Sequence, residues 1–116
     1  MKFERELLKG VAPLVVLEIL SRGAMYGYEL SEAIARRSRN VLTLRRGTLY
    51  PLLYNLEAKR MVKGNWEEAD NGRNRRYYSI TSRGKKHLST QKQQWEKLQA
   101  GVNLVLQMPA PSVSFA

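Results

Sequence analysis

One β-hairpin signal interrupts a chain whose other patterns are helical, and it restricts the fold more than any other feature. Met61 to Glu67 has the pattern of a strand, and Arg75 to Thr81 has that of the return strand. Between them stands Asn71-Gly72, a pair that suits a tight hairpin turn or the tip of a longer hairpin. Helical patterns precede and follow this segment. The sequence therefore predicts an α+β fold, mainly α, with one hairpin before the last helix.

Two helices are expected near the N-terminus. Apolar residues at helical spacing predict the first over about residues 4–21. Pro13 lies inside it and removes one backbone donor, so we expect the helix to start there or to be kinked between Gly10 and Pro13. The second helix begins at Gly27 and should end between Arg37 and Asn40. The short β-prone run Val41 to Leu44 follows and can form a small strand.

The third helix has two chemically different sides. Thr48 is its expected N-cap, and Pro51 should fall in the first turn, where its missing N–H costs nothing. Four leucines follow the i, i+3, i+4, i+7 pattern of a buried stripe, namely Leu49, Leu52, Leu53 and Leu56. The remaining side carries aromatic, amide and basic groups.

A long fourth helix is expected from about Arg83 to Met108, capped by Thr81 or Ser82. Its apolar residues recur at steps of 3.5 on average, which is the seam of a coiled coil: Leu88, Trp95, Leu98, Val102 and Val105. Gln91 takes one seam position, and Gly101 is a weak point. Pro109 and Pro111 should close the helix. We expect this helix to pair two copies of the chain.

The chain has 116 residues, which fits one domain, and we place this domain at residues 1–81, a dimerisation helix at 82–108 and a flexible tail at 109–116. There is no cysteine, and no apolar run approaches the roughly 20 residues of a membrane span. We expect a cytoplasmic protein with no membrane partner, no metal and no cofactor. His87 is the single histidine and Asp70 the single aspartate, so the residues nearly exclude an enzyme.

Basic residues gather in the middle of the chain. Residues 36–76 carry eleven basic and four acidic side chains, whereas the whole chain has a net charge of +10. Such a stretch suits a polyanion, because each neutralised phosphate releases counterions. A solubilising surface is the alternative, and the excess alone does not decide between them.

The order of elements matches a winged helix-turn-helix, in which the third helix enters the major groove of double-stranded DNA. On that basis the expected DNA-binding residues of the third helix are Arg45, Arg46, Thr48, Tyr50, Pro51, Tyr54 and Asn55, and those of the hairpin are Arg73, Arg75 and Arg76. Tyr50 or Tyr54 could instead pack against the hairpin, and the hairpin arginines could simply be solvated. Because side chains alternate along a strand, Arg75 and Arg76 should point to opposite faces.

Several strings resemble the PadR family of bacterial transcriptional regulators, especially its short subfamily. They are Leu8-Lys9-Gly10, Tyr26-Gly27-Tyr28-Glu29-Leu30, Gly47-Thr48-Leu49-Tyr50-Pro51-Leu52-Leu53 with Leu56-Glu57, and Arg76-Tyr77-Tyr78 with Ile80-Thr81 and Gly84. From the residues alone, Tyr26 and Tyr28 can serve the phosphates or a core or cap role.

The resemblance implies a homodimeric repressor whose last helix packs against the partner's N-terminal region. Because such a dimer is two-fold symmetric, we expect its operator to be palindromic. The resemblance also implies release by a small planar or phenolic effector in some members. Trp95 would border that effector site, although simple packing in the seam is the alternative for this tryptophan. The competing hypothesis for the whole chain is a winged-helix adaptor that binds protein or RNA without operator specificity.

Overall fold

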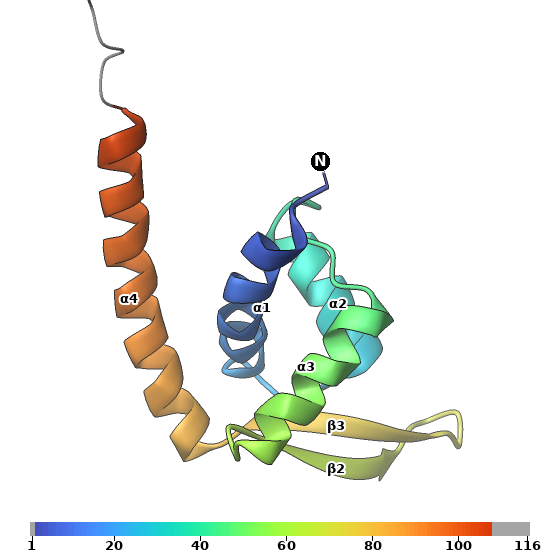
Figure 1. The fold of residues 1–116 in the computed structure, drawn as a ribbon. Helices are drawn as coiled ribbons and strands as arrows, with labels where there is room; N and C mark the ends of the chain where they lie inside the picture. The colour runs from blue at the N-terminus through green and yellow to red at the C-terminus, as the bar shows by residue number, and fades with distance from the viewer. Residues whose placement is uncertain (1, 108–116) are drawn as a thin grey trace, which may run out of the picture.

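The computed structural model describes residues 2–107 and contains three helices, a small sheet and a long final helix (Figure 1). The elements are α1 (Arg5–Leu20), β1 (Met25–Tyr26), α2 (Gly27–Arg37), α3 (Arg46–Ala58), β2 (Val62–Glu68), β3 (Asn74–Ile80) and α4 (Ser82–Leu106). The expected mainly α fold with one hairpin is confirmed. No helix within residues 2–107 is long and apolar enough to cross a membrane.

The core lies where α1, α2 and α3 meet the inner face of the sheet. The most deeply buried side chains come from every one of these elements: Val16, Leu17, Leu20, Leu30, Ile34, Leu49, Leu53, Val62 and Tyr78. Each helix contributes a stripe at helical spacing, so its opposite side stays in solvent. This arrangement fixes α3 on the body through its leucines and leaves its polar side free.

The sheet contains three antiparallel strands in the order β1-β3-β2. Val62 pairs with Ile80 at one end of the hairpin, and Glu68 pairs with Asn74 at the other. The small extra strand is β1, in which Met25 pairs with Tyr78. The prediction of a strand at residues 41–44 is wrong. Leu44 is buried in the core there, and burial rather than strand pairing accounts for the apolar run.

The start of α3 differs from the prediction. Arg45 is the N-cap residue, with extended backbone angles, and the helix begins at Arg46. The amide of Thr48 already donates to the carbonyl oxygen of Arg45 at 3.0 Å, so Thr48 is not the cap. Pro51 consequently lies inside the helix rather than in its first turn. The segment before α3 is anchored by buried Leu44, and this tertiary contact sets the start.

The end of α3 is a Schellman motif built on a non-glycine residue. The Met61 amide donates to the Leu56 carbonyl, and the Arg60 amide donates to the Glu57 carbonyl, both at 2.9 Å. Arg60 takes the left-handed conformation, with φ of 61°. Glycine usually fills this position because it has no Cβ to strain.

Helix α1 runs continuously through Pro13, from Arg5 to Leu20. The helix does not start at the proline, so that part of the expectation is wrong. Proline removes one donor to the Lys9 carbonyl, and the neighbouring turns keep their hydrogen bonds. Ala12 and Val16 are buried on either side of Pro13, so packing holds this part of the helix in place.

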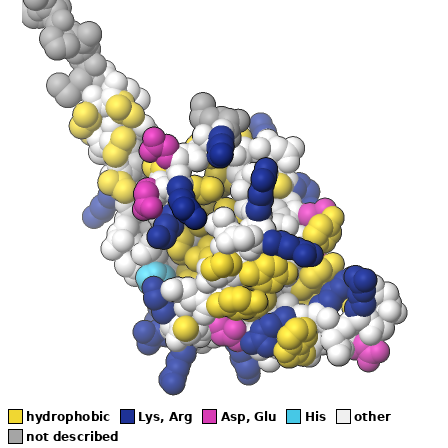
Figure 2. Space-filling view, turned by 45° about the vertical axis from the view of Figure 1, so that its right-hand side comes forward, with side chains coloured by type: hydrophobic (Ala, Val, Ile, Leu, Met, Phe, Trp, Pro, Cys, Tyr) yellow, Lys and Arg dark blue, Asp and Glu magenta, His cyan; other side chains and the backbone are white. Residues whose placement is uncertain are grey.

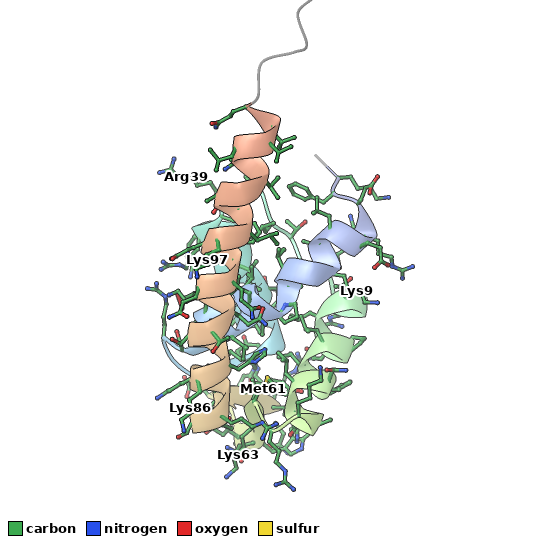
Figure 3. All side chains as sticks on the ribbon, turned by 60° about the vertical axis from the view of Figure 1, so that its left-hand side comes forward. Lys9, Arg39, Met61, Lys63, Lys86 and Lys97 are labelled. Atoms are coloured by element: carbon green, nitrogen blue, oxygen red, sulfur yellow. The ribbon has the colours of Figure 1, made fainter. Side chains whose placement is uncertain are left out.

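Helix α4 is attached to the rest of the fold at its first turns. Thr81 caps it as expected, accepting from the Gly84 amide at 3.0 Å. The same hydroxyl donates to the Arg60 carbonyl at 2.7 Å, and the Thr81 amide donates to the Met61 carbonyl at 3.0 Å. Figure 3 places Met61 at the base of α4, below the part of the helix that carries Lys97.

Two further contacts hold α4 against α1. Leu88 is buried in the common core, and the Lys92 ammonium contacts the Glu18 carboxylate at 2.8 Å. Beyond these contacts α4 extends away from the body (Figure 1). It ends at Leu106 with Gln107 as its C-cap, close to the predicted end at Met108. The predicted tail at 109–116, with Pro109 and Pro111, lies outside the described residues.

Candidate nucleic-acid interface

The solvent-facing side of α3 gathers most of the residues predicted for DNA binding. Six of the seven predicted there are exposed, namely Arg45, Arg46, Thr48, Pro51, Tyr54 and Asn55. The arginines stand at the N-terminal end of the helix, and the amide and aromatic groups follow along it. Figure 2 shows Lys and Arg side chains around a patch of hydrophobic side chains on one face of the molecule. The side therefore offers hydrogen-bond donors, acceptors and positive charge together.

Tyr50 is the seventh residue, and it lies partly against the core. A Cβ built on Gly27 would lie 2.7 Å from the Cζ atom of the Tyr50 ring, so only glycine leaves room for that ring at the start of α2. The Tyr50 and Tyr54 rings are 6.2 Å apart. The Tyr-Gly-Tyr and Gly-Thr-Leu-Tyr-Pro strings thus meet in space, which gives a physical reason for their presence together.

The wing comprises β2, β3 and the loop 69–73 between them. The Ala69 amide donates to the Arg73 carbonyl at 2.8 Å, and Gly72 has a positive φ of 80°. Asn71 accepts from the Arg73 amide through its side chain at 3.1 Å. The turn is therefore the tip of a longer hairpin, one of the two forms expected for Asn71-Gly72. Arg73 is exposed at this tip.

Arg75 and Arg76 point to opposite faces of β3, as the strand alternation predicts. The Arg75 guanidinium lies 4.4 Å from the centre of the Tyr26 ring. On the other face, Arg76 forms an ion pair with Glu57 of α3 at 2.5 Å. Both arginines are partly buried, whereas Arg73 is exposed. The three wing arginines therefore have three different surroundings.

Glu57 connects α3 to both strands of the wing. Its carboxylate accepts from the Arg76 guanidinium and, at 3.2 Å, from the backbone amide of Gly64. The hydrogen bond that Arg76 donates to Glu57 raises the pKa of Arg76 further above its ordinary value. A Cβ on Gly64 would lie 2.6 Å from the Arg76 Nε atom, so the glycine leaves space for this contact. Sequence reasoning missed this role for Glu57, because nothing local pairs it with a residue on the far strand.

The two tyrosines at the start of α2 have different positions. Tyr26 is the N-cap residue, and its backbone amide donates to the Glu29 carboxylate at 3.3 Å. Its ring packs edge-on against Tyr77, with centres 5.4 Å apart, so Tyr26 caps α2 and packs on the sheet outside the buried core. Tyr28 is exposed, and a hydrogen bond to Glu32 raises the pKa of its hydroxyl.

Most of the predicted dimerisation residues lie on the part of α4 that leaves the body. Trp95 is 40% exposed, and the exposed fractions of Leu98, Val102 and Val105 are 63%, 46% and 66%. Leu88 is instead buried in the core of its own chain. Figure 2 shows hydrophobic side chains on the free end of the helix.

An open groove of about 280 Å³ separates α1 from α4. Its lining is largely apolar: Glu6, Leu7, Gly10, Val11, Leu14, Gln91, Gln94, Trp95 and Leu98. Trp95 thus lines an open, largely apolar groove between the two helices.

The chain matches the PadR-like family of transcriptional regulators over residues 16–90, which span α2, α3, the wing and the first turns of α4. It belongs to the PadR-like family. Relatives of this PadR-like chain include a PadR-like transcriptional regulator from Bacillus cereus, which is 33% identical with a TM-score of 0.77 and matches over 90% of this chain and 99% of its own. A PadR family regulator from Eggerthella lenta is 31% identical with a TM-score of 0.78, over 90% and 88% of the two chains.

A transcriptional regulator from Clostridium thermocellum has the same arrangement, with 28% identity, a TM-score of 0.78 and coverage of 84% and 95%. The PadR-like proteins are regulators of transcription and not enzymes. This chain is therefore a DNA-binding regulator with the winged-helix arrangement of that family.

Proposed function

We propose that this PadR-like protein is a homodimeric repressor that binds a palindromic operator. The observation that carries the proposal is the exposed polar side of α3, with Arg45 and Arg46 at its start and the wing beside it. In a winged helix this helix enters the major groove, and the wing reaches a neighbouring groove or its phosphates.

The side chains suit different parts of that contact. Arg45 and Arg46 can pair with guanine edges or phosphates, and Asn55 can pair bidentately with adenine. Thr48 and Tyr54 carry hydroxyls that hold phosphates. Among the wing arginines, exposed Arg73 and partly buried Arg75 remain for the DNA. We assign Arg76 to holding the wing against α3, and Tyr50 to the α2–α3 contact. Pro51 adds apolar surface beside them.

Footprinting on the DNA upstream of the protein's own gene tests the proposal. Protection of an inverted repeat supports an operator-binding dimer. Salt-sensitive binding without sequence preference would support the adaptor hypothesis instead. The variant Arg45→Ala/Arg46→Ala should weaken binding at least about tenfold and reduce the salt dependence by one or two phosphate contacts. The control Lys85→Ala/Lys86→Ala removes the same charge from α4 and should bind nearly as the parent does.

The seam of α4 supports the dimer. No apolar side chain of α4 beyond Leu88 is buried within the chain, so the described part of the helix exposes a row of apolar groups. Contiguous apolar surface of this kind marks an interaction site. When a second copy binds, the apolar row of each chain covers that of the other, because a two-fold interface uses the same patch on both chains.

Light scattering tests that seam. Leu98→Glu/Val102→Glu puts two charges on it and should give monomers that no longer bind an operator tightly. Gln99→Glu/Asn103→Glu adds the same charges on neighbouring positions of the same turns and should stay dimeric. A seam double variant that remains a dimer would show that another surface pairs the chains.

We further propose that a planar or phenolic compound enters the α1–α4 groove beside Trp95 and releases the DNA. The largely apolar lining supports an aromatic ligand. In a Trp66→Phe variant, Trp95 is the remaining tryptophan, so its fluorescence reports on the groove. No change with a broad panel of planar aromatics would count against the effector, leaving simple packing as the role of Trp95.

A further inference from the structure

The surface between α3 and the wing exposes two large aromatic side chains, Tyr54 and Trp66. We call it the α3–wing junction and define it by Tyr54, Glu57, Gly64, Trp66 and Arg76. The Glu57 carboxylate accepts from both Arg76 and the Gly64 amide, so it fixes both strands of the wing against α3. The junction is therefore a firm surface rather than a gap between two mobile parts.

Trp66 stands on the α3 side of this surface. It lies directly opposite Arg76 in the strand register, and cross-strand partners share a face of the sheet. The Arg76 guanidinium lies 5.7 Å from the centre of the Trp66 ring. Strand β2 is an edge of the sheet, so no further strand covers Trp66 from outside.

Nothing within the described chain accounts for the exposure of this indole. Trp66 is 66% exposed, and Tyr54, one turn before Glu57 on α3, is 56% exposed. The charge of Arg76 is already met by Glu57, so the cation does not require the ring. Large apolar groups left in solvent on a rigid surface indicate contact with a partner.

The position of the junction favours DNA as the partner. When α3 occupies the major groove and the wing reaches the adjacent minor groove, the sugar–phosphate strand between those grooves must cross the junction. The two elements that flank the junction carry exposed positive charge, with Arg46 at the start of α3 and Arg73 at the tip of the wing. A deoxyribose presents apolar C–H groups to an aromatic ring, and its phosphates accept hydrogen bonds.

We propose that Trp66 is a DNA-contact residue, packing its indole against a deoxyribose of the strand between the two grooves while its Nε1–H donates to a phosphate oxygen. Tyr54 contacts the same strand from α3. Arg76 is a positioning residue that supports the indole from within the protein. This inference rests on the proposed DNA-binding mode, with α3 in the major groove and the wing beside it.

The first test uses the Trp95→Phe variant, in which Trp66 is the remaining tryptophan. A duplex of the upstream DNA serves as the probe, and acrylamide, a neutral quencher, reports the accessibility of the indole. Saturating duplex should reduce the Stern–Volmer constant of Trp66 at least about twofold. An unchanged Stern–Volmer constant with fully bound duplex would overturn the proposal. This test keeps Trp66 unmutated.

The second test measures affinity. Trp66→Ala should raise Kd for the duplex about tenfold, and Trp66→Phe, which keeps an aromatic face, should recover much of the loss. Circular dichroism confirms that each variant is folded. If Arg45→Ala/Arg46→Ala loses binding while Trp66→Ala binds as the parent does, the role of Trp66 is wrong and the proposed function stands. If both variants bind as the parent does, the proposed binding mode itself is wrong.

Discussion

Gly84 is the position at which the structure and simple helix propensity predict opposite results. It lies in the first turn of α4, and alanine is worth about 1 kcal/mol more than glycine inside a helix. By propensity alone, Gly84→Ala would stabilise the protein. The glycine is buried, however, and a Cβ there would overlap the backbone carbonyl oxygen of Met61 and approach the Ile80 side chain.

The carbonyl of Met61 cannot move aside freely. It accepts from the Thr81 amide and hydroxyl, and the Thr81 hydroxyl also contacts the Arg60 carbonyl. An added methyl must therefore displace α4 as a unit. Forcing a methyl into such a site costs typically about 1–3 kcal/mol, and the fixed backbone places Gly84→Ala near the upper end. After the gain in propensity, we expect a net loss of about 1–2 kcal/mol in the free energy of unfolding.

Urea unfolding followed by circular dichroism measures this difference at a fixed protein concentration, because the stability of the proposed dimer would depend on concentration. Gly101→Ala is the matched control on the same helix. Nothing lies within 4 Å of a Cβ at Gly101, so this variant should be more stable by about 0.5–1 kcal/mol. A Gly84→Ala protein as stable as the parent, or more so, would refute the reasoning from the Met61 contact.

Three further substitutions test other contacts. Arg60→Gly should raise the free energy of unfolding by about 0.5–1 kcal/mol because it relieves the left-handed backbone, whereas Arg60→Ala removes the same charge and should give no gain; equal effects in urea unfolding would contradict this. The hydrogen bond from Lys92 lowers the pKa of Glu18 below its ordinary 4.5, so the pair stabilises the fold above that pH and the contribution is lost as the pH falls through the lowered value. Lys92→Met should therefore cost about 0.5 kcal/mol at pH 7 and nothing once Glu18 is protonated, and a cost independent of pH would point to lost packing instead. Gly27→Ala should cost about 1–2 kcal/mol by displacing the Tyr50 ring, and adding Tyr50→Ala should recover about 1 kcal/mol relative to the sum of the two single changes, as a double-mutant cycle would measure.

Features decided by local chemistry were predictable from the sequence. Thr81 caps α4 as expected, because its hydroxyl can accept a hydrogen bond from a free backbone N–H in the first turn of the helix. The exposed side of α3 follows from its leucine spacing, and the opposite directions of Arg75 and Arg76 follow from strand alternation. These predictions need only neighbours along the chain.

Features decided by a distant partner were not predictable in this way. The strand at Met25–Tyr26 exists because β3 offers it an edge, and its two residues carry little signal of their own. The expected cap at Thr48 fails because buried Leu44 sets where α3 begins. The site follows the same rule. Arg76 was expected to face DNA, but its contact with Glu57 comes from a residue 19 positions away.

The attachment of α4 to the end of α3 has a mechanical consequence. The hydrogen bonds of Thr81 to the carbonyls of Arg60 and Met61 attach the first turn of α4 to the residues that end α3. With 25 residues, α4 is a stiff arm about 37 Å long. A tilt of about 5° at its base moves the far end by roughly 3 Å. Conversely, a displacement of about 3 Å at the far end would rotate α4, and α3 with it, by about 5°. In the proposed dimer, the distance between the two α3 helices would therefore depend on how rigidly this joint is held, with Gly84 at its centre.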